Sequence, residues 1–65
     1  MTGTVKWFSD EKGFGFIIPE EGGKDLFVHG SQVDESSRPL KDSQRVSYRV
    51  GDGRKGPEAQ EVRAA

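Results

Sequence analysis

The sequence contains no cysteine, so disulfide bridges and thiolate metal sites cannot stabilise its fold. It has no apolar stretch near the ~20 residues of a membrane span, and no signal-peptide core follows Met1. It also lacks an excess of positive charge, because 10 basic residues stand against 11 acidic ones. Domains that bind duplex DNA typically have a pI above about 9. We therefore expect a cytoplasmic protein without a membrane partner, in which any nucleic-acid binding depends on local placement of charge and aromatic rings.

The length of 65 residues predicts a single domain spanning 1–65. A domain of this size buries only about 60% of its unfolded surface, so its core is small. Large aliphatic residues are scarce, but the net charge is only −1. Disorder usually requires low hydrophobicity together with high net charge. A folded domain is therefore expected.

Short runs of β-branched and aromatic residues predict five strands, over residues 4–8, 14–18, 25–29, 45–50 and 59–62. The first three strands form an antiparallel meander with short turns. Residues 30–43 are expected to form a longer loop with one helical turn around 31–33, and residues 51–57 a flexible loop. Five strands leave two open edges unless the sheet closes. The predicted fold class is therefore all-β, a small five-stranded barrel.

Alternation predicts that several aromatic side chains point to solvent, because successive residues of a strand face opposite sides. If the aliphatic residues of the second and third strands fill the core, the outward positions are Phe14, Phe16, Phe27 and His29. The opposite arrangement would bury the imidazole with the rings and expose most of the aliphatic side chains. The sequence therefore favours a solvent-facing group of three phenylalanines and one histidine.

An exposed aromatic face suits single-stranded nucleic acid, because every base has a π-face and each stack contributes about 1–3 kcal/mol. Four cations lie near these aromatics in the sequence or in the loop after the fourth strand, and they are predicted phosphate contacts: Lys6, Lys12, Arg54 and Lys55. A protein-interaction barrel that uses the same patch is the main alternative. Acidic residues clustered in the loops, with lysines beside the aromatics, favour the nucleic-acid interpretation.

The first strand leaves the orientation of Trp7 open. With Val5 in the core, strict alternation sends Trp7 inward and Phe8 outward. Lys6 and Trp7 both face solvent only if the strand is bulged or strongly twisted at this point.

Catalysis is not expected from this sequence. It has one histidine, and no positioned third group accompanies His29 and Ser31. Gly13-Phe14-Gly15 lacks the third glycine of a dinucleotide fingerprint. Carboxylates at calcium-ligand spacing are also missing. We therefore predict no cofactor, no metal and no small-molecule substrate.

Four segments together resemble the bacterial cold-shock protein family, the cold-shock domain form of the OB-fold: residues 3–8, 12–17, 26–29 and 54–59. The resemblance implies a monomeric, antiparallel five-stranded OB-fold barrel that binds single-stranded RNA and DNA, with a preference for pyrimidine-rich segments. It implies an RNA chaperone that affects translation or transcription, often in the stress response to cold. It also implies that Trp7 lies on the surface, and that the nucleic-acid contacts include Lys6, Trp7, Phe8, Phe14, Phe16, Phe27, His29 and Lys55.

Two departures of the sequence from the family pattern matter most. Gly30 stands where members commonly carry an aromatic residue, and the loop 34–39 lacks the aromatic that members commonly have there. Arg38 is a partial substitute, since a guanidinium can stack on a base. Ser9 replaces a common asparagine. We therefore expect binding to fewer bases, and weaker binding, than in a fully aromatic relative.

Overall fold

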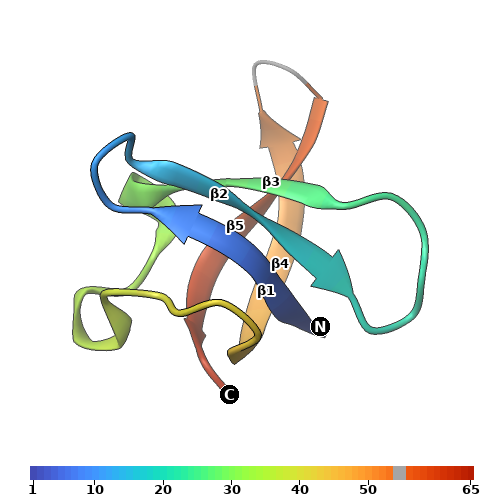
Figure 1. The fold of residues 1–65 in the computed structure, drawn as a ribbon. Coiled ribbons are helices and arrows are strands. Elements are labelled where there is room, and N and C mark those ends of the chain that lie inside the picture. The colour runs from blue at the N-terminus through green and yellow to red at the C-terminus, as the bar shows by residue number, and fades with distance from the viewer. Residues whose placement is uncertain (54–55) are drawn as a thin grey trace.

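The computed structural model describes residues 1–53 and 56–65, which form five strands and two short 3₁₀ helices (Figure 1). In chain order they are β1 (Thr2–Ser9), β2 (Phe14–Pro19), β3 (Leu26–His29), η1 (Gly30–Gln32), η2 (Glu35–Ser37), β4 (Arg45–Gly53) and β5 (Gly56–Ala64). Within the described ranges, no helix is long and apolar enough to cross a membrane.

The strands close into a barrel in the order β1-β2-β3-β5-β4, which confirms the predicted fold class. The pairs β1–β2, β2–β3, β1–β4 and β4–β5 are antiparallel. The remaining seam, β3–β5, is parallel and pairs Phe27 with Glu58 and Val28 with Ala59. This seam brings the C-terminal strand beside the strand that carries Phe27.

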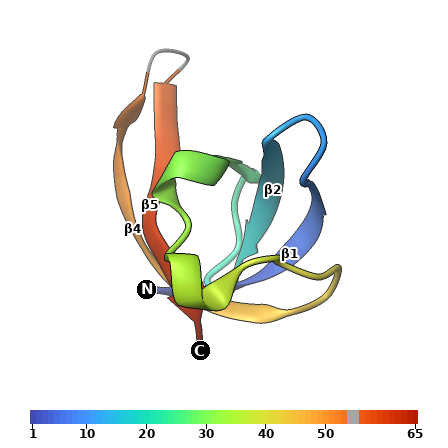
Figure 2. The ribbon, with the colours of Figure 1, turned by 90° about the vertical axis from the view of Figure 1, so that its left-hand side faces the viewer.

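Strand boundaries differ from the prediction mainly around the last hairpin. β4 continues to Gly53 and β5 begins at Gly56, so most of the predicted loop 51–57 is strand. The hairpin extends beyond the barrel as a two-stranded ribbon (Figure 1). The predicted helical turn near residues 31–33 is present as η1, whereas η2 was not predicted. Both helices lie in the segment that joins β3 to β4, at the front of the view in Figure 2.

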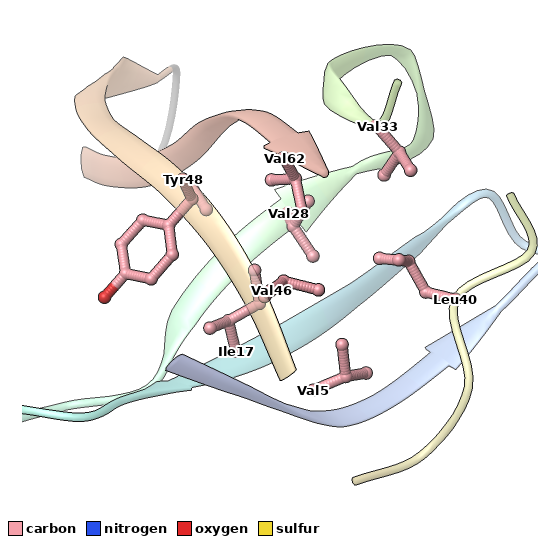
Figure 3. Close-up of a cluster of buried hydrophobic side chains, with 9 residues drawn as sticks. Val5, Ile17, Val28, Val33, Leu40, Val46, Tyr48 and Val62 are labelled. Atoms are coloured by element: carbon pink, nitrogen blue, oxygen red, sulfur yellow. The ribbon is translucent and has the colours of Figure 1, made fainter. Parts of the chain in front are cut away.

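The core is formed by inward side chains of all five strands and of the β3–β4 connection (Figure 3). Ile17 and Val28 are completely buried, which confirms the predicted alternation in β2 and β3. Val33 and Leu40 complete the core from the connection. Burial raises the pKa of the Tyr48 phenol, with smaller contributions from the nearby acidic loop.

Candidate nucleic-acid interface

Four aromatic rings from three strands meet on the outer face of the barrel. We call Trp7, Phe14, Phe16 and Phe27 the aromatic cluster. The indole centroid of Trp7 lies 5.6 Å from that of Phe14 and 5.3 Å from that of Phe16. The ring of Phe27 lies 5.7 Å from Phe14 and 5.8 Å from Phe16, so the contacts form a closed cycle. These distances are within the range of favourable aromatic pairs, so the rings hold one another in place while remaining partly exposed.

A β-bulge in β1 brings Trp7 into the cluster. Val5 pairs with Ile17, but the next pair is Trp7 with Phe16, so Lys6 is the extra residue on β1. The bulge reverses the alternation, and Trp7 therefore faces outward together with Phe16. Gly15 makes this close strand approach possible, because a Cβ there would lie 2.3 Å from the Trp7 carbonyl oxygen. Trp7, whose orientation the sequence left open, thus faces outward.

Phe8 lies on the opposite side of β1 from Trp7. It pairs with Gly15, is half-buried and packs against the core. Its ring also extends toward Gly30, where a Cβ would be 3.7 Å from Cζ of Phe8. The structure therefore places Phe8 beneath the rim of the face rather than in the aromatic cluster.

His29 extends the outer face beside Phe14, its partner across the β2–β3 pair. The backbone N–H of Ser31 donates to Nδ1 of His29 over 3.1 Å, and the Ser31 hydroxyl lies 2.9 Å from the same nitrogen. Because Nδ1 accepts this bond, the neutral ring carries its proton on Nε2. The exposed imidazole is thereby oriented and presents Nε2–H as a donor.

The lysines near the cluster differ in their surroundings. The Nζ of Lys6 lies 2.9 Å from a carboxylate oxygen of Asp25, and both side chains are partly exposed. Lys12 is exposed in the β1–β2 turn, and no ion pair to it occurs in the part of the chain that the structure describes. Sequence reasoning missed Asp25, because its contact with Lys6 joins the β2–β3 loop to β1.

Arg38 reaches the site from the β3–β4 connection. Its guanidinium donates to the carbonyl oxygen of Gly30 over 2.7 Å. The cation is therefore held next to the position where the family pattern has an aromatic ring. The remaining predicted contact, Lys55, lies outside the described residues, as does Arg54.

The geometry provides stacking surfaces and a few polar groups rather than reactive ones. In residues 1–53 and 56–65, no three His, Cys, Asp or Glu side chains are grouped so as to hold a metal ion. What the arrangement can do is bind flat aromatic ligands and make hydrogen bonds at their edges.

Comparison with known proteins agrees with this geometry. Residues 1–65 match the sequence profile of the family described as 'Cold-shock' DNA-binding domain. The chain is 54% identical to the cold shock-like protein CspA of Vibrio cholerae, over 98% of this chain and 93% of that protein. It is 53% identical to the probable cold shock protein A of Mycolicibacterium smegmatis, over 94% of this chain and 92% of that protein. The chain therefore belongs to the cold-shock domain family, whose members bind single-stranded nucleic acids and are not enzymes.

Proposed function

We propose that this protein binds single-stranded RNA and DNA by stacking bases on the aromatic cluster, and that it acts as a monomeric cytoplasmic RNA chaperone affecting translation or transcription. The proposal includes a preference for pyrimidine-rich strands. The observation that supports it best is the closed cycle of four partly exposed rings on one face. Three strands supply these rings, so the stacking surface is already formed before any ligand binds.

The proposed contacts form two groups. The stacking group comprises the aromatic cluster, and Phe8 is a further proposed contact beneath its rim. The polar group comprises Lys6, Lys12, His29 and Arg38 around the cluster, together with Lys55, which lies outside the described residues. A base stacked on Phe14 would lie close to the Nε2–H of His29, because the two residues pair across β2 and β3. The lysines are suited to phosphates, which accept charge-assisted hydrogen bonds.

The alternative, a protein-interaction module, would use the same rings. Protein interfaces also favour aromatic residues. The two functions differ in their response to salt, because binding of lysines to phosphates releases counterions from the nucleic acid. They also differ in ligand, since an oligonucleotide without any protein is sufficient for the proposed function.

The test uses Trp7, the single tryptophan of the chain. Oligo-dT or oligo-U heptamers should quench its fluorescence at low salt, a duplex of the same length should do so far less, and added salt should weaken binding. No change in fluorescence at high oligonucleotide concentration would contradict the proposed function and favour a protein partner.

A pair of variants separates stacking from general hydrophobicity. Phe27→Leu removes one ring of the cluster and retains an apolar side chain, and we expect about a fivefold or greater loss of affinity. Ile18→Ala is the matched control, because Ile18 is 43% exposed and lies two residues beyond Phe16 on the same face of β2. We expect the control to bind like the parent protein.

A further inference from the structure

The aromatic cluster continues into a strip of polar side chains on β5. Phe27 of β3 pairs with Glu58 of β5 across the parallel seam. The next pair, Val28 with Ala59, is completely buried, so Phe27 and Glu58 both face outward. Adjacent strands are about 4.8 Å apart, which places the backbone of Glu58 directly beside that of Phe27. Gln60 follows on the same face of β5.

Two glycines of β4 determine how these polar side chains lie. A Cβ at Gly51 would be 2.3 Å from Oε1 of Gln60, and a Cβ at Gly53 would be 2.5 Å from Oε2 of Glu58. The side chains of Gln60 and Glu58 therefore lie across β4 in space that any other residue would fill. The amide nitrogen Nε2 of Gln60 also donates to Oε1 of Glu58 over 3.4 Å. The carboxylate is thus held in a defined place over β4, on the side of β5 away from Phe27.

A carboxylate that meets the edge of a stacked base discriminates between bases. It accepts hydrogen bonds and repels carbonyl and ring-nitrogen acceptors. Guanine presents two neighbouring donors on one edge, N1–H and the 2-amino group, and matches both carboxylate oxygens. Cytosine and adenine present one amino group beside an acceptor nitrogen, and the single N–H of uracil lies between two carbonyl oxygens.

We propose that Glu58 is a specificity-determining residue that selects guanine where a base stacked on Phe27 extends across β5 toward β4. The inference rests on the proposed function, because the base must first stack on the aromatic cluster. It goes beyond a general preference for pyrimidine-rich strands, since it predicts one position at which a purine of a particular kind is favoured.

The test is a scan with single-stranded heptamers of uridine that contain one guanosine, placed at each position in turn. Affinities are measured by quenching of Trp7 fluorescence. At one position we expect guanosine to bind about tenfold tighter than adenosine, as for a bidentate base contact. Inosine lacks the 2-amino group, and we expect it to lose most of this advantage. Glu58→Gln should remove the difference between guanosine and inosine, because an amide offers only one acceptor oxygen.

Glu35→Gln is the matched control, because Glu35 is an exposed acid in η2 and the substitution changes the net charge equally. Glu35→Gln should retain the guanosine preference. If only the loss of one negative charge mattered, Glu35→Gln and Glu58→Gln would reduce this preference alike. Equal affinity for guanosine and adenosine at every position, or a preference that survives in Glu58→Gln, would overturn the inference. If no oligonucleotide binds to the parent protein, the proposed function fails as well, so the two failures are distinguishable.

Discussion

The effect on binding of lacking an aromatic side chain at position 30 can be tested by adding one. Gly30 follows His29 at the rim of the outer face, and its φ lies outside the left-handed region, so other residues can adopt its backbone conformation. A Cβ there would lie 3.2 Å from the carbonyl oxygen of Gly13, a contact that relaxes by a shift of a few tenths of an ångström. Gly30→Phe is therefore compatible with the fold and adds one ring beside the existing face.

The expected gain in affinity follows from the energy of one stack, about 1–3 kcal/mol. This corresponds to at least about a fivefold lower Kd for an oligo-dT heptamer. The strain of the close contact with Gly13 is present in both the free and the bound protein, so it lowers stability but cancels from the affinity. Tighter binding together with a slightly lower unfolding midpoint is the expected combination.

The assay is a titration of Trp7 fluorescence with oligo-dT for the parent protein, Gly30→Ala and Gly30→Phe, with urea unfolding of each. Gly30→Ala creates the same Cβ contact without a ring, so it should match the stability change and leave the affinity unchanged. If folded Gly30→Phe binds no tighter than the parent protein, the reasoning that the stacking surface ends at this position is wrong.

Two further predictions concern charge. Lys12→Gln should reduce the slope of log K against log salt for single strands by about 0.7. Lys6→Gln should reduce this slope less, because the ammonium of Lys6 already lies 2.9 Å from Asp25. Equal slopes for the two variants would contradict the expected difference between the lysines. Hydrogen bonds from Thr2 and Arg45, together with the Arg45 charge, hold the pKa of Glu20 below its ordinary value of 4.5. The folded pKa is the lower one, so this stabilisation is present above about pH 4.5 and is lost as the pH falls through the folded pKa. Glu20→Gln should therefore have a lower Tm than the parent protein at pH 7, and this Tm difference should disappear at acidic pH. A Tm difference that persists at pH 2 would contradict the role assigned to the Glu20 carboxylate.

The sequence predicts well those features that depend on neighbouring residues. The alternation of Ile17 with Phe14 and Phe16 is a local property of an extended chain, and it correctly placed the core and the outward rings of β2. The helical turn after β3 is also local, since the Ser31 N–H bonds to the His29 side chain two residues earlier.

Features that depend on pairing between distant segments were not predictable in this way. The parallel seam joins Phe27 to Glu58, and no local pattern encodes the relative position of strands so far apart in the chain. The orientation of Trp7 depends on the absence of a side chain at Gly15 on the neighbouring strand. The sequence identified a bulge as the condition for an outward Trp7 but could not establish that the bulge forms.

The distribution of charge makes stacking and base-edge contacts more important than phosphate contacts in the proposed site. The chain carries a net charge of −1, and one of the two described lysines near the cluster is already paired with a carboxylate. Few released counterions mean a shallow dependence on salt and little affinity that is independent of sequence. Stacking itself discriminates weakly, because every base has a π-face. Selectivity must then come from groups that meet the base edges. In the proposed site these are the Nε2–H of His29, a donor beside Phe14, and the carboxylate of Glu58, an acceptor on the β4 side of Phe27.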